Sequence, residues 1–528
     1  MPTDKQDHSI LKNALRMAFG TMTSRVLGQL RESLMAYYFD KRITDAWAAA
    51  FKIPNMFRRL LGEGSLSVSF IPVFVEAKHD SALRAQNLVN SVYSFLLLVL
   101  GCLTAFGVLY PNPLLNVVLD PAYIADTEKY LQTLRMTKIM FGFVFFISSY
   151  AYMMGILNAL GSFTLPAIAP TFWNLCMIIS TVMPDSYFSV PGDQLALGVL
   201  VGGALQALIL VPALMRSGYF PKLSFDYKNK DFQKVISNMA PGLLGMGLLQ
   251  FTTIINLRFS SSLVEGTISY ISYVDRLIEL PLSLISVSLG TALLPALSGY
   301  VARGEKKLFS QSARHYLELN LIVTMAAAAG LFVLAHPIIN LLFGRGRFLP
   351  SDVLITAEIL KTYCWIMIFS SGVRVLTPAY YSVKNTWFPA LTSCLCLAFH
   401  LIMAPNLMAH YQVHGLMMST IISAAINLTL LLLFFKKLVA EFEYAAFFKN
   451  IFVYLGLALL TGFVANIYFV VESLIPQGNF FVIFNLTVSI TLAMTLFLLT
   501  AYFLKINAVR EILEKLKNKL ISKIRIKR

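Results

Sequence analysis

Charged residues are scarce in this 528-residue chain, and their scarcity excludes an ordinary soluble protein. Asp, Glu, Lys and Arg make up 13% of the sequence and hydrophobic residues 57%, whereas soluble domains are about 25% charged. The mean hydropathy is +0.69. Apolar stretches long enough to cross a bilayer recur along the chain. The composition therefore predicts an all-α polytopic membrane protein with about 14 transmembrane helices of roughly 20 residues each.

Cysteines are few, and enzyme motifs are missing. The five cysteines lie in apolar stretches, at spacings typical neither of a disulfide framework nor of a metal site. The sequence has no Gly-x-Ser-x-Gly, no phosphate-binding loop before Lys-Ser/Thr and no His–Glu metal motif. We therefore expect no enzyme, no catalytic residue, no metal and no cofactor. Any transport must then run on ion gradients, on the membrane potential or on coupling to a downstream process, and we expect the membrane potential, with or without a coupling cation.

Lysine and arginine are concentrated in alternate loops, which predicts the orientation of the chain. Residues 216–234 and 303–314 are rich in them, whereas residues 185–193 and 471–477 contain none. The positive-inside rule then places the basic loops and both termini in the cytoplasm. The tail 505–528 has nine basic and two acidic residues. Its apolar residues recur at helical spacing, so we expect an amphipathic helix on anionic lipid rather than a nucleic-acid-binding tail.

A basic linker divides the predicted helices into two halves of six. Each half has an apolar pair followed by proline in its second helix, at Phe70–Pro72 and at Leu293–Pro295. Because six is an even number, the two halves would share one orientation in the membrane. The predicted domains are residues 1–217 with helices 1–6, 218–437 with helices 7–12, 438–504 with helices 13–14, and the tail 505–528.

The charges that remain inside apolar helices are the most informative feature of the chain. Arg25 and Arg31 lie in predicted helix 1, Arg58 and Arg59 in helix 2, and Arg276 in helix 8. A charge at the centre of a membrane helix costs about 2.5–3.5 kcal/mol, so such residues face a water-filled cavity rather than lipid. Guanidinium groups keep their charge and match the geometry of phosphate. A cavity lined by arginine therefore predicts an anionic cargo.

Helix 2 places its polar residues side by side. Asn55, Arg58 and Arg59 stand at i, i+3 and i+4, so they adjoin on the helix surface. Arg59 and Glu63 are four residues apart and could pair. The alternative interpretation is an internal ion pair that only holds helices together, which leaves one of the two arginines unexplained.

Helix 8 carries charges of both signs. Glu279 follows Asp275 by four residues and Arg276 by three, so its carboxylate can reach both. We expect Asp275 and Glu279 to orient Arg276 or to exchange a proton, with a structural pair as the alternative. Arg374, in predicted helix 10, has the sign that a basic cavity needs but stands alone.

Several motifs together resemble a known family. They are Ser24–Gly28, Thr44–Ala46, Pro54–Asn55, Arg58–Arg59 with Glu63–Gly64, Tyr273–Glu279 and Gly290–Pro295. On these residues the chain is similar to the bacterial lipid II flippases. These are the MurJ/MviN-type members of the multidrug/oligosaccharidyl-lipid/polysaccharide exporter superfamily, and the resemblance covers essentially the whole chain. One departure is Glu32, where the family often has Asp; the charge is kept, but the reach of the side chain differs.

The resemblance implies both a fold and a set of site residues. The fold would have two six-helix lobes, with helices 13 and 14 forming a groove for a lipid tail. The diphosphate of the substrate would be bound by Arg25, Arg31, Arg58 and Arg276. Support or gating of the cavity would fall to Asp45, Asn55, Arg59, Glu63, Asp275 and Glu279.

The resemblance also implies a function in peptidoglycan biosynthesis, cell-wall biogenesis and cell shape. The chain would move lipid II, the undecaprenyl-diphosphate-linked precursor, from the cytoplasmic to the outer leaflet of the bacterial inner membrane by alternating access. Its expected partners are lipid II, membrane lipid and peptidoglycan-synthesis enzymes, and no nucleic acid. Two interpretations stay open beside this one: an exporter of another anionic lipid-linked oligosaccharide, and a membrane scaffold for wall-synthesis enzymes.

Overall fold

The computed structural model describes residues 22–60, 66–283, 286, 288–474, 478–504, 506 and 510, and every regular element among them is helical. The predicted all-α fold is thereby confirmed. The contacts within the chain divide it into two compact units. Unit 1 contains the residues up to Ser269 together with Arg345–Phe348, and unit 2 contains Tyr270–Gly344 and the residues from Leu349 onward.

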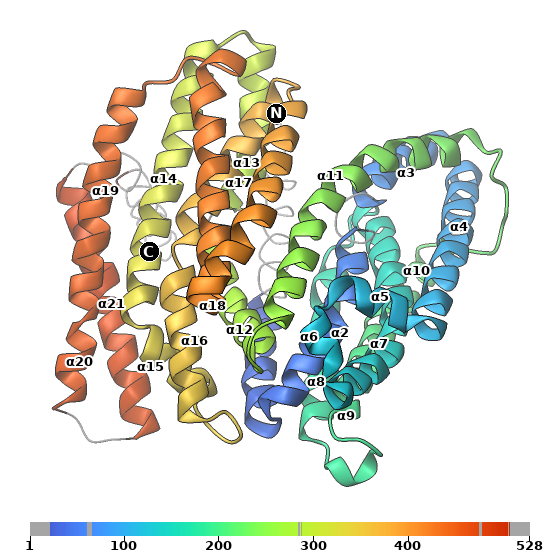
Figure 1. Ribbon diagram of the computed structural model, residues 1–528. Helices are drawn as coiled ribbons and strands as arrows, with labels where there is room; N and C mark the ends of the chain where they lie inside the picture. Colours follow the sequence, from blue (N-terminus) through green and yellow to red (C-terminus); the bar gives the residue numbers. More distant parts are fainter. Residues whose placement is uncertain are drawn as a thin grey trace, which may run out of the picture. The chain divides into compact units, whose positions relative to one another are not determined.

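Unit 1 is a helical bundle built around α7. This helix contacts α2, α3, α4 and α9 (Figure 1). Of its apolar segment 72% is buried, against 28% for α4, so α7 lies at the centre and α4 on the outside. The first described helix covers residues 22–38. The others are α2 (Lys41–Phe57), α3 (Leu66–Asp80), α4 (Ala82–Leu109), α5 (Pro111–Val118), α6 (Pro121–Ala125), α7 (Thr127–Ala159), α8 (Thr164–Val182), α9 (Asp193–Leu208), α10 (Val211–Arg216) and α11 (Lys230–Ser261).

Side-chain caps explain where three of these helices begin. Asp40, Ser81 and Asn229 precede α2, α4 and α11, and each accepts a hydrogen bond from a backbone N–H of the following first turn. Such caps satisfy donors that have no partner within the helix. α2 contains Pro54 and ends at Phe57. Residues 58–60 then form a wider, π-type turn, a local irregularity that is frequent at functional sites.

Unit 2 packs around α14, which contacts α13, α17 and α19 (Figure 1). Its longest element, α18, joins two helices across a kink at Gln412, where φ is 52°. Helices α19 and α21 pack against each other. The elements are α12 (Thr267–Leu282), which begins in unit 1, then α13 (Ser288–Ala302), α14 (Lys306–Val333), α15 (Ala335–Phe343), α16 (Pro350–Tyr363), α17 (Ile366–Ser382), α18 (Trp387–Leu438), α19 (Tyr444–Ala465), α20 (Ile467–Glu472) and α21 (Asn479–Phe503).

The described helices are those of a polytopic membrane protein. Eight of them are long and apolar enough to cross a membrane, and the bent pair α16–α17 would be a ninth. Predicted helices 2 and 8 fall outside this group because the described residues of each form two helices of 15 to 17 residues, α2 with α3 and α12 with α13, and residues 61–65, 284, 285 and 287 between them are not described. In addition, α18 covers two predicted spans in one element. The total of about 14 spans therefore stays a prediction.

The two units divide the chain later than the basic linker at which the sequence analysis placed the domain boundary. Helix α11 follows this linker, yet it contacts α2, α3, α4 and α5 and so belongs to unit 1. The division falls inside α12, after Ser269. The predicted domains were drawn by counting helices, and packing need not follow that count. The predicted tail 505–528 lies outside the described residues except for Ile506 and Arg510.

Candidate functional site

Arg31, predicted to bind the cargo, is buried inside unit 1 and is 3% exposed. It pairs with the carboxylate of Glu32. Its Nη1 donates to Asn174 Oδ1 at 3.2 Å, and its Cζ lies 4.6 Å from the centre of the Trp173 ring. A buried charge needs such partners, because its removal from water is costly unless ion pairs and hydrogen bonds compensate.

Asn174 links the helix of residues 22–38 to α8. Its Nδ2 donates to the carbonyl oxygen of Ser24 at 3.0 Å and to the Ser24 hydroxyl at 3.1 Å. Its Oδ1 accepts from Arg31. The side chain is 4% exposed, so both ends of the amide are used within the bundle. The position of Arg31 therefore depends on a residue that the sequence did not single out.

Arg25 lies on the same helix but in a different environment. It is partly exposed, and it forms no ion pair with any residue in the described part of the chain. A cation in this state is free to accept an anionic ligand without first breaking a pair with one of those residues. Of the predicted arginines in unit 1, Arg25 thus best fits a binding role.

Arg58 lies at the end of α2, where its Nε donates to Asn55 Oδ1 at 2.8 Å. The helical spacing predicted that these two residues adjoin, and the bond confirms it. Arg58 and Arg59 are both partly exposed, in the π-type turn that follows α2. The predicted pairing of Arg59 with Glu63 lies outside the described residues.

Asp45, which the resemblance marked as a cavity acid, lies in the enclosed interior of unit 1. It is 1% exposed and accepts from Lys129 Nζ at 3.0 Å. The backbone N–H groups of Gly266 and Ser269 donate to it at 2.7 and 2.8 Å, and the Ser269 hydroxyl at 2.8 Å. Gly266 directly precedes α12 and Ser269 lies in its first turn, where the helix dipole favours a negative charge. The support or gating role of Asp45 stays a prediction.

The charged residues of helix 8 lie on α12 in unit 2. Asp275 and Arg276 are partly buried and Glu279 is exposed. Unit 2 therefore contains Asp275, Arg276 and Glu279. Unit 1 contains Arg25, Arg31 and Arg58. Their roles in binding and gating stay predictions.

Arg374 is exposed on α17, and its backbone is approached closely by a glycine from a resemblance motif. A Cβ atom built on Gly290 of α13 would lie 3.0 Å from the Arg374 carbonyl oxygen. This distance is tight for a real Cβ, so glycine permits the close packing of α13 on α17. The glycine of that motif therefore has a packing reason independent of any ligand.

Four residues that hold the predicted site residues were not predicted: Lys129, Trp173, Asn174 and Ser269. A polar residue in an apolar helix is a signal for function, and Asn174 carries that signal, whereas Lys129 lies in the polar sequence before the apolar part of α7. The partner of each is not visible in the sequence, because Arg31 and Asn174 are 143 positions apart. Among the described residues no group of three or more His, Cys, Asp or Glu side chains is placed to hold a metal ion.

Known proteins similar to this chain are lipid II flippases. The family model described as Lipid II flippase MurJ matches residues 35–491. The chain is 51% identical over 436 residues to a probable lipid II flippase MurJ of Bdellovibrio bacteriovorus, with 82% of this chain and 83% of the relative covered. It is 31% identical over 387 residues to the lipid II flippase MurJ of Burkholderia cenocepacia, with 72% and 75% covered.

Solved structures show the same fold. A lipid II flippase MurJ in an inward closed conformation matches with a TM-score of 0.77 at 24% identity, over 93% of this chain and 98% of that one. An inward-facing multidrug resistance MATE family transporter of the MOP superfamily matches with a TM-score of 0.66 at 12% identity, over 81% and 98%. The family match spans most of the chain and confirms the resemblance. The chain therefore belongs to the MurJ family of lipid II flippases.

Proposed function

We propose that this protein moves lipid II from the cytoplasmic to the outer leaflet of the bacterial inner membrane by alternating access. It is a transporter rather than an enzyme, as its family is. One observation carries the proposal for the site. Arg25 lies in the helix of residues 22–38, is partly exposed and has no ion-pair partner among the described residues. A guanidinium that pairs with no described carboxylate suits the diphosphate of a lipid-linked precursor.

The exposure of the arginines supports an order of binding. Arg25 and Arg58 are partly exposed, so they contact the diphosphate first. Arg31 joins them when its guanidinium turns from Glu32 toward the ligand, and Arg276 is the fourth arginine of the proposed binding set. Each exchange replaces a carboxylate or amide partner of an arginine by a diphosphate oxygen, so the charge of the arginine stays compensated. Six further residues support these arginines or gate the cavity: Asp45, Asn55, Arg59, Glu63, Asp275 and Glu279.

The energy source in this proposal is the membrane potential, with or without a coupling cation. Moving one elementary charge across 100 mV is worth about 2.3 kcal/mol. An empty cavity with net positive charge would therefore respond to the potential, and a cavity neutralised by diphosphate would not. The basic loops support an orientation with both termini in the cytoplasm. Peptidoglycan-synthesis enzymes would then receive the precursor on the outer face.

The test is the exposure of lipid II on the outer leaflet, measured with an external probe in bacteria depleted of their own flippase. Cells would carry the native chain, Arg25→Ala, or Arg216→Ala as a matched control, since Arg216 is exposed in the last turn of α10. Equal amounts of each protein in the membrane are verified first. We expect exposure with the native chain and with Arg216→Ala, and loss of exposure with Arg25→Ala.

Two other results would contradict the proposal in different ways. A well-expressed native chain that restores nothing would favour an exporter of another anionic lipid-linked oligosaccharide. Full exposure with Arg25→Ala would remove the arginine from the binding step. The scaffold interpretation, in which the charges are structural pairs such as Lys129 with Asp45, predicts instead that even the native chain restores no exposure.

A further inference from the structure

Helix α4 carries a stripe of polar side chains on the outside of unit 1. Gln86, Asn90 and Ser94 are four residues apart and so lie on one face of the helix. Only 28% of the apolar segment of α4 is buried, so most of it faces away from the bundle. Hydrocarbon offers no hydrogen-bond partners, so polar groups at this surface need partners from the protein.

The partners of this stripe come from the backbone of the linker, residues 218–229, which precedes α11. Three bonds join them: Gln86 Nε2 to the Phe220 carbonyl oxygen at 2.9 Å, Lys222 N–H to Asn90 Oδ1 at 2.8 Å, and Ser224 N–H to Ser94 Oγ at 2.7 Å. Two residues of extended chain advance about 6.6 Å and four helical residues about 6.0 Å, so the two repeats match. The linker is therefore a defined ladder along α4 rather than a loose loop.

The ladder reaches the level at which the apolar part of α4 begins. From Gln86 to Ser94 the helix rises by about 12 Å. The uninterrupted apolar stretch of α4 starts at Phe95, so Ser94 lies directly at its edge. The linker residues around Ser224, which is bonded to Ser94, are thus held beside the edge of the hydrocarbon region.

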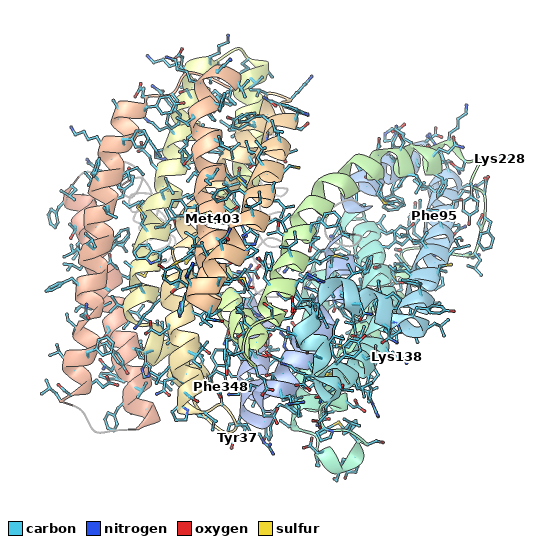
Figure 2. The ribbon with its side chains drawn as sticks, viewed as in Figure 1. Tyr37, Phe95, Lys138, Lys228, Phe348 and Met403 are labelled. Atoms are coloured by element: carbon cyan, nitrogen blue, oxygen red, sulfur yellow. The ribbon has the colours of Figure 1, made fainter. Side chains whose placement is uncertain are left out.

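At this level the linker presents large apolar side chains outward. Leu223 is 70% exposed and Phe225 is 60% exposed. Phe225 has one ring neighbour, Tyr227, whose own ring packs against Phe95 of α4 and Phe232 of α11. This aromatic contact fixes the outer end of the linker, on the side of unit 1 where Figure 2 labels Phe95 and Lys228. Apolar side chains that the described residues leave largely exposed indicate contact with lipid or another apolar partner.

The charge of the linker decides between these partners. Three lysines are exposed here: Lys222 and Lys228 of the linker, and Lys230, the first residue of α11. Asp226 is the one acidic residue from 218 to 230. Figure 2 shows the Lys228 side chain pointing away from the helices. Apolar side chains beside lysines are the pattern of a segment that lies in a membrane interface, with its ammonium groups at the anionic headgroups.

We propose that the linker is a binding site for anionic phospholipid of the cytoplasmic leaflet. Leu223 and Phe225 insert among the acyl chains, while Lys222, Lys228 and Lys230 bind the headgroups. The orientation rests on the proposed topology of the chain, but lipid binding does not depend on transport of lipid II. Because the linker ends at Asn229, the N-cap of α11, bound lipid would hold the entry to α11 at the membrane surface.

The test uses tryptophan fluorescence of the full chain in vesicles. Phe225→Trp adds one reporter, and the emission of the four native tryptophans is removed by subtracting the signal of the native chain. Vesicles contain phosphatidylcholine and phosphatidylglycerol, with bromine on the acyl chains of one or the other. We expect brominated lipid to quench the added emission, and brominated phosphatidylglycerol to quench it more strongly than brominated phosphatidylcholine. Aqueous iodide should have little effect.

A second variant separates charge from insertion. This variant carries three substitutions in the Phe225→Trp chain: Lys222→Gln, Lys228→Gln and Lys230→Gln. It should lose the preference for phosphatidylglycerol but still be quenched by both brominated lipids. Equal quenching by the two brominated lipids in the chain with native lysines would overturn anionic recognition. Strong quenching by iodide with none by brominated lipid would show that the linker faces water or a protein partner, and would overturn the proposal as a whole. Neither readout measures flipping, so failure here is distinct from failure of the proposed function.

Discussion

Replacing Lys129 by methionine is expected to destabilise unit 1 strongly. Lys129 is 6% exposed, and its Nζ lies 3.0 Å from the Asp45 carboxylate and 4.7 Å from the centre of the Tyr123 ring. Removing one partner of a buried ion pair costs about 3–5 kcal/mol, because the other charge stays buried without compensation. Asp45 keeps its three donors from Gly266 and Ser269. We therefore expect a loss near the lower end, about 3 kcal/mol.

The assay is thermal unfolding of the purified full chain in detergent. A loss of about 3 kcal/mol corresponds to a drop in Tm on the order of 10 °C for a unit of this size. Lys138→Met is the matched control, because Lys138 lies on the same helix, α7, but is exposed (Figure 2). A surface substitution of this kind should change the free energy of unfolding by no more than about 0.5 kcal/mol.

A double variant tests the cause of the loss. Lys129→Met combined with Asp45→Asn removes the stranded charge together with its partner, so it should recover part of the lost stability. Asparagine can still accept from Ser269, which preserves part of the attachment of α12. Two results would refute the reasoning: Lys129→Met unfolding at the same temperature as Lys138→Met, or a double variant less stable than the single one.

Two further predictions concern unit 1. Arg84→Met should loosen the attachment of α11, because Arg84 donates to both carboxylate oxygens of Asp231 at 2.7 Å. This hydrogen-bonded guanidinium lowers the pKa of Asp231, so the stabilisation is present above the unfolded pKa of about 3.9 and is lost as the pH falls through the folded pKa. Acid unfolding should show this loss in the native chain and not in the variant, and identical acid profiles would contradict the pairing. Gly346→Ala should lower the Tm more than Gly304→Ala. Both glycines have a positive φ, +64° at Gly346 and +72° at Gly304. A Cβ at Gly346 would lie 2.2 Å from the Tyr37 carbonyl oxygen, whereas a Cβ at Gly304 would meet open space. Equal drops in Tm would refute this contact.

The membrane fold, the family and the presence of arginines within helices could all be predicted from the sequence, because each is a local property. A span needs about 20 consecutive apolar residues, and a charge inside such a stretch is visible without knowing its partner. Residues three apart on a helix adjoin by geometry alone. The bond of 2.8 Å between Arg58 and Asn55 follows from that spacing.

Tertiary structure alone decided which of these charges are paired and which remain available. Arg31 meets Asn174 across 143 positions, and Asp45 meets Ser269 across 224. The linker lies on α4, with Gln86 and its backbone partner 134 positions apart. Hydropathy and helical periodicity describe one segment at a time, so they do not specify which faces of distant helices meet. Those contacts depend on the packing of the whole bundle, and they separate the buried Arg31 from the partly exposed Arg25 on a single helix.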